Sequence, residues 1–255
     1  MKPDKVRVEA SRRQWLHNAG MLSLAGLAGC APEKIADQTS EPNARESANA
    51  EQPASEPITS GREALEQLIA GNARFVEGKT RHAHESASWR KHLVGSQHPH
   101  TVVIGCSDSR VPPELVFDQG FGEVFTIRVA GNIIADDVLG SIQYARVHLK
   151  TPLIVVMGHG GCGAVTAAVE YKRGQAKEPP FITKLIERIE PGLAKLDLDM
   201  PLEQLIAEAV KLNVRSSVEQ ITSYPAAKAS LDRGDVLVVG AIYDLATGSV
   251  EFLDS

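Results

Sequence analysis

Four short apolar runs constrain the fold of this chain more than any other feature. Each is nearly continuous and rich in valine or isoleucine, which is typical of strands buried on both faces. Such strands occur in parallel sheets that helices cover on both sides. The runs span residues 101–105, 124–129, 153–158 and 236–242.

Segments with helical periodicity lie between these runs and beyond them. The first helix is expected to begin after Thr59, and Gly71 and Asn72 mark a point where it can break. The others are expected over residues 136–149, 164–171, 181–196 and 202–223. A turn at Thr247 and Gly248 predicts a last strand that returns antiparallel. We therefore expect an α/β fold: a four-stranded, mostly parallel sheet with an antiparallel edge strand and helices on both faces.

The first 29 residues have the order of an export signal. Basic residues precede an apolar segment over 19–29, which is shorter than the roughly 20 residues that span a bilayer. Arg12 and Arg13, followed by Gln-Trp-Leu, resemble a twin-arginine signal. The Leu-Ala-Gly-Cys sequence that ends at Cys30 resembles a lipobox, which implies a lipid on Cys30. Cleavage that leaves no lipid and an uncleaved anchor are the alternatives.

Residues 30–58 have a different composition from the rest of the chain. They contain four prolines among Ala, Ser, Glu and Gln, and no aromatic residue. Such a segment cannot bury a core, so we expect a disordered tether there and one folded domain over 59–255. With the signal and the lipid, this organisation predicts an exported domain on the periplasmic face of a membrane, the outer membrane being preferred.

Charge and cysteine count exclude two classes of protein. The formal net charge of −5 argues against a nucleic-acid partner. Three cysteines are an odd number and do not form a disulfide framework. If Cys30 carries a lipid, Cys106 and Cys162 remain for other chemistry.

Chemically active side chains follow two of the predicted strands. Cys106 follows the strand over 101–105, and His159 follows the strand over 153–158, with Cys162 three residues later. Ligands bind at the carboxyl ends of strands in such sheets. Asp108 lies one alternation beyond Cys106 and faces the same way. Because Zn²⁺ prefers such ligands, we expect a zinc site of Cys106, Asp108, His159 and Cys162, with Gly160, Gly161 and Gly163 letting the backbone approach the ion.

Arg110 gives Asp108 two possible states. It lies on the same face as Asp108, so the two side chains can form a two-bond ion pair. Asp108 either binds the metal and closes the site, or pairs with Arg110 and leaves a position open for a water whose pKa falls towards about 7. Two other interpretations remain open: Cys106 as a small buried apolar residue, and the glycine-rich stretch as a phosphate-binding turn.

The CSDSR motif at 106–110 and the HGGCG motif at 159–163 together resemble the β-class carbonic anhydrases. GNARFVEG, GEVFTIRVAGN and GSIQYARVHLK extend the likeness over about residues 60–255. The resemblance implies reversible hydration of CO2 to bicarbonate and a proton by zinc-bound hydroxide. It implies Zn²⁺ on Cys106, His159 and Cys162, with Asp108 and Arg110 as a gating and orienting pair. It also implies a homodimer or a dimer of dimers that exchanges N-terminal helices and has active sites at the subunit interface.

Three further positions match the plant-like branch of that family. There, Gln97 would donate a hydrogen bond to CO2 or bicarbonate, and Phe125 and Tyr144 would line the pocket. We also expect a backbone N–H at Gly160 to bind a bicarbonate oxygen. The alternatives are a surface glutamine, a core phenylalanine and a tyrosine on a helix face. No bicarbonate-sensitive site of the other branch can be matched, so we expect the open state at neutral pH.

Two other functions fit the same motifs. Relatives of this fold hydrolyse carbon disulfide or carbonyl sulfide with the same ligands. A zinc-stabilised binding domain is the non-enzymatic alternative, and it predicts a closed site. The pair of Asp108 and Arg110 favours an enzyme, because a purely structural site does not need a ligand that can dissociate from the metal.

Overall fold

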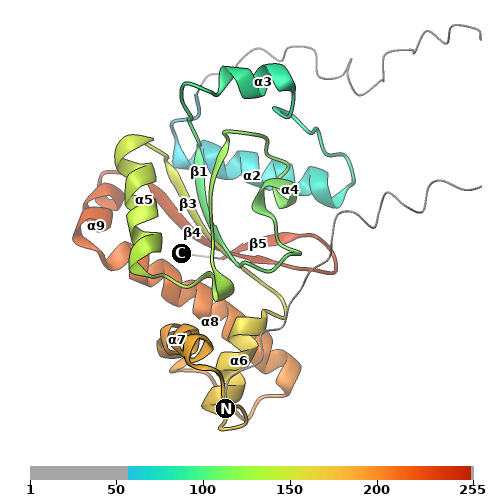
Figure 1. Ribbon diagram of the computed structural model, residues 1–255, viewed down its shortest axis with the longest axis vertical. Helices are drawn as coiled ribbons and strands as arrows, with labels where there is room; N and C mark the ends of the chain where they lie inside the picture. Colours follow the sequence, from blue (N-terminus) through green and yellow to red (C-terminus); the bar gives the residue numbers. More distant parts are fainter. Residues whose placement is uncertain (1–56, 254–255) are drawn as a thin grey trace, which may run out of the picture. The chain divides into compact units, whose positions relative to one another are not determined.

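A five-stranded sheet forms the centre of the computed structural model, which describes residues 57–253 (Figure 1). Its strand order is β2-β1-β3-β4-β5; β1 to β4 are parallel, and β5 is antiparallel to β4. The expected parallel sheet with an antiparallel edge strand is therefore confirmed. The strands are β1 (Thr101–Gly105), β2 (Val124–Arg128), β3 (Leu153–His159), β4 (Leu237–Tyr243) and β5 (Val250–Leu253).

Helices and short 3₁₀ turns make up most of the connections. The α-helices are α2 (Gly61–Val76), α3 (Ala87–His92), α4 (Pro113–Val116), α5 (Asp136–His148), α6 (Gly163–Lys172), α7 (Pro180–Ile189), α8 (Leu202–Ser223) and α9 (Pro225–Asp232). The 3₁₀ turns are η1 (Ala130–Asn132) and η2 (Glu190–Leu193). The short helices α3, α4 and α9 carry no strong periodic signal and were not predicted.

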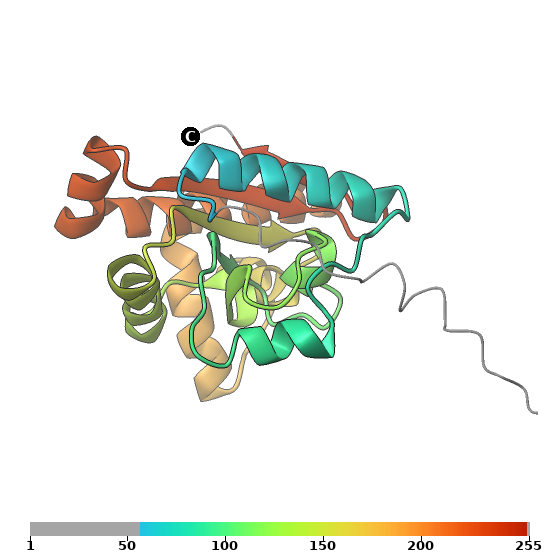
Figure 2. The same cartoon turned by 90° about the horizontal axis from the view of Figure 1, so that it is seen from above.

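Helices cover both faces of the sheet, as Figure 2 shows. On one face, α2 and α4 pack over Val103 of β1 and Val155 of β3. On the other face, α5 and α8 pack over Val102, Ile104 and Val156. Successive side chains of a strand point to opposite faces. The central strands are apolar at every position because each of them serves two separate cores.

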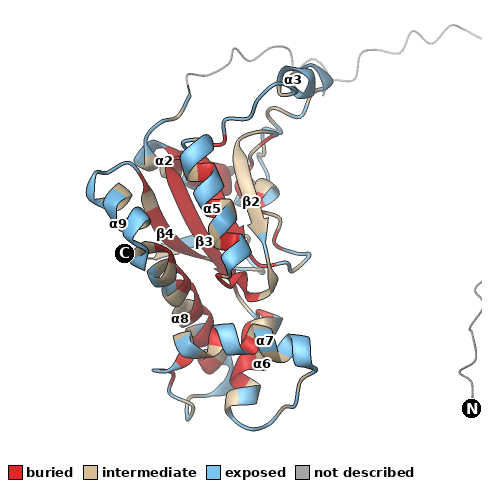
Figure 3. Ribbon diagram, turned by 60° about the vertical axis from the view of Figure 1, so that its left-hand side comes forward, coloured by how far each residue is buried: buried red, intermediate tan, exposed pale blue. Residues whose placement is uncertain are grey.

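A third apolar cluster lies beyond the carboxyl ends of the strands. There α6 and α7 pack against η2 and α8. Figure 3 shows the buried residues continuing from β3 and β4 into α6 and α8. Cys106 and Cys162 belong to this cluster. The predicted reactive residues therefore lie between the edge of the sheet and a helical layer that excludes water from one side.

Two predicted helices differ from the structure. The helix could have broken at Gly71 and Asn72, but α2 continues through them to Val76. The Asn72 side chain is buried, and its Nδ2 donates to the carbonyls of Val116 and Gly248. These long-range bonds outweigh the low helix propensity of the Gly-Asn pair. The helix predicted over 181–196 ends at Ile189, where the chain tightens into η2 at Pro191.

Several predictions fall outside the described residues. They are the export signal over 1–29, the lipid on Cys30 and nearly all of the tether over 30–58. Ile58, which we placed in the tether, packs against the apolar cluster that contains Ala64 and Leu68 of α2, so the packed region begins at least one residue earlier than predicted. No helix within residues 57–253 has the length and hydropathy needed to cross a membrane.

Candidate metal centre

The two predicted motifs meet at one edge of the sheet. β1 and β3 are parallel neighbours, and their register pairs Gly105 with Met157. Cys106 directly follows β1, and His159 is the last residue of β3. Cys162 lies at the N-cap of α6, after a turn in which Gly161 has a positive φ of 62°. The topology therefore brings together residues that are more than fifty positions apart in the sequence.

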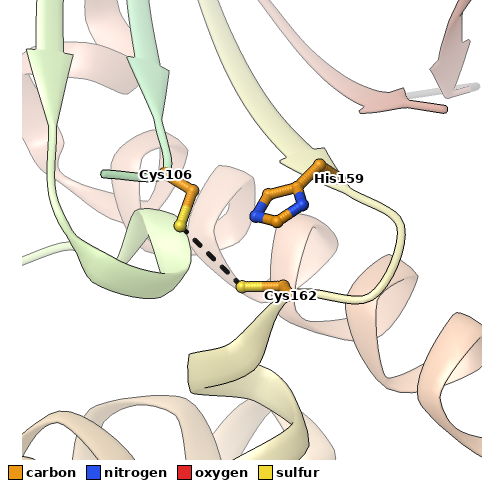
Figure 4. Close-up of side chains that lie close together, drawn as sticks. All are labelled: Cys106, His159 and Cys162. Carbon is orange, nitrogen blue, oxygen red and sulfur yellow. Dashed lines mark hydrogen bonds between the residues drawn. The ribbon is translucent and has the colours of Figure 1, made fainter. Parts of the chain in front are cut away.

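Three side chains point towards one another at this edge (Figure 4). The Cys106 and Cys162 sulfurs are 3.9 Å apart. The ligand atoms of Cys106, His159 and Cys162 all lie within 4.8 Å of one another. All three residues are buried, with exposed fractions of 5%, 0% and 1%. Such a group of soft and borderline ligand atoms is suited to a metal ion.

The His159 ring is held in the orientation of a metal ligand. Its Nδ1 lies 3.0 Å from the Gly160 carbonyl oxygen, which can only accept, so Nδ1 carries the proton. Its Nε2 is buried and has no hydrogen-bond partner within the described part of the chain. A buried imidazole nitrogen costs free energy unless something binds it. The lone pair of Nε2 is therefore available to a metal ion.

The geometry fits Zn²⁺. Two zinc–sulfur bonds of about 2.3 Å at the tetrahedral angle place the sulfurs about 3.8 Å apart. The distance of 3.9 Å between the Cys106 and Cys162 sulfurs agrees with this value. Two thiolates and one imidazole leave one tetrahedral position without a protein ligand. That is the arrangement of a catalytic zinc site, since structural sites have four protein ligands.

Asp108 pairs with Arg110 beside this group. The Arg110 Nε donates to Asp108 Oδ1 over 2.9 Å, and Nη2 donates to Oδ2 over 2.6 Å. The Arg110 guanidinium and the Arg110 backbone N–H hold the pKa of the Asp108 carboxyl well below its usual range. Asp108 Oδ2 is still only 3.9 Å from His159 Nε2. The carboxylate therefore stays ionised at the border of the site, in the pairing that we associated with the open state.

The two cysteines titrate as a pair in the metal-free chain. A hydrogen bond from the Cys162 thiol lowers the pKa of Cys106 to about 4, and the nearby His159 ring and the backbone N–H groups of Asp108 and Gly131 act in the same direction. The same bond to Cys106, together with burial, raises the pKa of Cys162. Cys106 is thus the more acidic thiol of the pair. Metal binding has to displace the thiol proton from Cys162.

Sequence analysis missed Arg128, the last residue of β2. Its Nε donates to the Cys106 carbonyl over 3.1 Å, and its Nη2 donates to the Asp108 carbonyl over 2.5 Å. One guanidinium thus clamps the backbone on both sides of Ser107. Nothing in the sequence indicates this role, because backbone carbonyls carry no residue signature.

Comparison with known proteins decides the family. The sequence model of the carbonic anhydrase family matches residues 101–250, more than half of the chain. The chain belongs to the β-carbonic anhydrase family. A carbonic anhydrase of Mycolicibacterium smegmatis is 38% identical to the enzyme over 196 residues, covering 74% of this chain and 91% of that protein. Carbonic anhydrase 2 of Mycobacterium tuberculosis is 35% identical over 206 residues, covering 78% and 95%.

The fold of the enzyme agrees with this assignment. The solved structure of the β-carbonic anhydrase CcaA matches it with a TM-score of 0.61 at 31% identity, covering 75% of this chain and 88% of that one. Enzymes of this family are zinc-dependent lyases that catalyse the reversible hydration of CO2. The predicted family, activity and zinc cofactor are confirmed.

Three of the four predicted substrate residues, Gln97, Phe125 and Tyr144, do not lie at the metal centre of their own chain. Phe125 is paired with Val102 near the amino end of β2, three residues or about 10 Å before Arg128. The rings of Phe125 and Tyr144 are 6.3 Å apart. Tyr144 and Gln97 line a pocket of about 600 Å³ with His148, and no metal-centre residue lines it. The roles of Gln97, Phe125 and Tyr144 stay predictions.

The predicted role of the Gly160 N–H needs correction. The Gly160 N–H donates to the Tyr243 carbonyl over 3.0 Å, so it continues the sheet and is not a donor for bicarbonate. A Cβ on Gly160 or Gly163 would meet no atom within 4 Å. Packing against the described protein atoms therefore does not require glycine at these two positions, and their predicted role beside a metal ion stays a prediction. Gly161 differs, because its positive φ favours glycine.

Proposed function

We propose that Cys106, His159 and Cys162 hold the zinc ion with which this β-carbonic anhydrase hydrates CO2. The observation that carries the proposal is the buried His159 Nε2, which has no hydrogen-bond partner among the described residues. It faces two sulfurs whose separation of 3.9 Å is that of two ligands on one zinc ion. Zinc bound in such a site lowers the pKa of a bound water and supplies a nucleophile near neutral pH.

In this proposal, Asp108 and Arg110 orient the reacting water. An ionised carboxylate only accepts hydrogen bonds, so Asp108 takes one from the water and directs an oxygen lone pair at CO2. Arg110 donates two side-chain bonds to the carboxylate, which keep it ionised and would keep it from binding zinc in place of that water. This pairing supports an enzyme that is open at neutral pH, as in the plant-like branch.

Metal content tests the ligand assignment. Cys162→Ser removes one sulfur of the close pair, and we expect zinc to fall from one ion per chain to nearly none. Cys30→Ser is the matched control, because it replaces the same residue type outside the predicted site and should keep one zinc per chain. Elemental analysis of the purified variants measures this. Full zinc in Cys162→Ser would exclude Cys162 as a ligand.

We further infer that Gln97, Phe125 and Tyr144 serve the metal centre of a second copy. β2 is an edge strand of the sheet, and its residues Val124 to Ile127 are only half-buried. Two copies related by a two-fold axis would pair their β2 strands antiparallel. That pairing would put the amino end of one β2, with Phe125, beside the carboxyl end of the other, with Arg128. The proposed assembly is therefore a homodimer, or a dimer of dimers, with shared active sites.

Mixed dimers test this arrangement. One chain carries Gln97→Ala and the other Cys162→Ser, each with its own affinity tag. If Gln97 acts on the partner's site, this dimer has one intact site and about half of the wild-type activity. If Gln97 acts within its own chain, the dimer has no intact site. The control pairs a wild-type chain with a chain that carries both substitutions. That dimer keeps one intact site only if Gln97 acts within its own chain, and none if Gln97 acts on the partner's site.

We also propose that the enzyme is exported and held at the periplasmic face of a membrane by a lipid on Cys30. The support is the sequence alone: the twin arginines, the short apolar segment and the Leu-Ala-Gly-Cys sequence. A domain that is exported after folding reaches an oxidising compartment with its thiolates already bound to zinc. Mass spectrometry of the mature protein should find a lipidated Cys30 as its first residue. An unmodified start at Ala31 would contradict the lipid.

A further inference from the structure

The turn η1 passes beside the metal centre and supplies a hydrogen bond to it. The Gly131 N–H donates to the Cys106 sulfur over 3.4 Å. Gly131 has a φ of 68°, and a Cβ there would lie 2.9 Å from Ile189 Cδ1 and 3.1 Å from Ala164 Cβ. Both the backbone conformation and the packing therefore require glycine, and they place this N–H against the ligand sulfur.

A buried amide from a distant helix holds this turn. Asn213 of α8 has an exposed fraction of 3%, and its Nδ2 donates to the Gly131 carbonyl over 2.9 Å. The Asn132 N–H, which belongs to the same peptide group as that carbonyl, donates to Val129 O over 2.9 Å. Both polar groups of this peptide are thus bonded. Its plane is fixed, and with it the backbone conformation of Gly131.

We propose that Asn213 is a positioning residue of the metal centre, because it keeps the Gly131 N–H directed at the Cys106 sulfur. The inference rests on the proposed zinc site. A hydrogen bond to a thiolate stabilises its negative charge, so it favours the deprotonated sulfur that binds a metal ion. Without Asn213, the Gly131 carbonyl is buried without a partner, and the turn reorients to find one. The N–H then leaves the sulfur.

The next turn of α8 offers a matched control. Ser217 has an exposed fraction of 1%, and its hydroxyl donates to the Asn132 carbonyl over 3.3 Å. It therefore binds the same turn from the same helix face, but at a carbonyl that does not belong to Gly131. If Asn213 only stabilised the turn, substitutions of Asn213 and Ser217 should affect the metal centre equally. If Asn213 positions the Gly131 N–H, only its substitution should affect the metal centre.

Zinc affinity is the first test, measured on the full chain by competition with a chromophoric chelator. Asn213→Leu keeps the size of the side chain and removes its donor. We expect zinc to bind about 10- to 100-fold more weakly in Asn213→Leu, and to change by less than about threefold in Ser217→Ala. Circular dichroism verifies that each variant is folded. If Asn213→Leu does not fold, Asn213→Ser, whose shorter hydroxyl does not span the gap, takes its place with the same expectation.

The second test replaces zinc with Co²⁺ and records the sulfur-to-metal charge-transfer band. Loss of a hydrogen bond makes a thiolate easier to oxidise, so the band should move to longer wavelength in the Asn213 variant and stay in place in Ser217→Ala. Wild-type affinity and an unmoved band in a folded Asn213 variant would overturn the proposal. Equal changes in both variants would also overturn it. Neither readout uses CO2, so this inference can fail separately from the proposed function.

Discussion

At the scale of single residues, the chemistry depends on side chains that are held by their neighbours. His159 presents Nε2 because its Nδ1 is bound to a carbonyl, and Asp108 stays ionised because Arg110 donates to both of its oxygens. The ligands and the ion pair could be predicted from the sequence, since cysteine, histidine and alternating charges have few other uses at a strand end. Arg128 and Asn213 could not be predicted, because they act on backbone carbonyls.

Asp108→Asn tests the orienting role. Asparagine keeps the shape of the side chain but loses the charge that Arg110 binds. We expect CO2 hydration to fall by about 100-fold or more, because a positioned proton acceptor contributes about that much to catalysis, while zinc stays at one ion per chain. Stopped-flow assays and elemental analysis measure the two quantities. Ser109→Ala, an exposed neighbour, should leave both unchanged, and a wild-type rate in Asp108→Asn would exclude the role.

At the scale of elements, the sequence predicts what is local and misses what depends on distant contacts. The runs of valine and isoleucine predicted the four parallel strands to within a residue or two. α2 does not break at Gly71 and Asn72, where a break was possible, and Asn72 bonds the carbonyl of Gly248, which lies 176 positions away. The end of α7 at Ile189 follows from Pro191, which is a local signal.

Asn72→Ala tests the stabilising role of this asparagine in α2. The substitution leaves two carbonyls and the Val250 N–H without their partner, all of them in buried or half-buried positions. We expect the free energy of unfolding, measured with urea, to fall by about 2–4 kcal/mol. Gln67→Ala, on the exposed face of the same helix, should change it by less than about 0.5 kcal/mol. An equally small change in Asn72→Ala would show that these bonds do not stabilise the helix.

At the scale of the whole molecule, stability should depend on the charge of one buried histidine. Burial lowers the pKa of His100 from its ordinary value of 6.5, against the raising effect of its bond to Gln119 and of nearby carboxylates. The folded chain thus prefers the neutral ring, while the unfolded chain binds a proton more readily. The contribution of the neutral His100 ring to the free energy of unfolding is complete above about pH 6.5 and is lost as the pH falls below it.

His100→Gln tests this dependence, because glutamine is neutral at every pH. Between pH 7.5 and pH 5, the free energy of unfolding should fall more steeply for the wild type than for the variant, with a difference of at most about 1.4 kcal/mol per pH unit. The comparison cancels the pH dependence of zinc binding, which both proteins share. Parallel curves would mean that folding does not change the pKa of His100.

The predicted substrate residues also belong to the scale of the whole molecule. Gln97 and Tyr144 line a pocket without the metal ligands of their own chain, and we propose that a second copy completes the active site. The sequence predicts the strand or helix on which these residues lie. It does not show whether they act in their own chain or in a second copy, because nothing in the sequence of an edge strand indicates what pairs with it.

The most direct test of the central claim is the rate of CO2 hydration by the purified full chain before and after zinc removal. We predict rapid hydration with one zinc per chain, loss of the activity on chelation, and its return when zinc is restored to the wild type but not to Cys162→Ser. A zinc-loaded wild type that does not hydrate CO2, or a Cys162→Ser variant that does, would contradict the account.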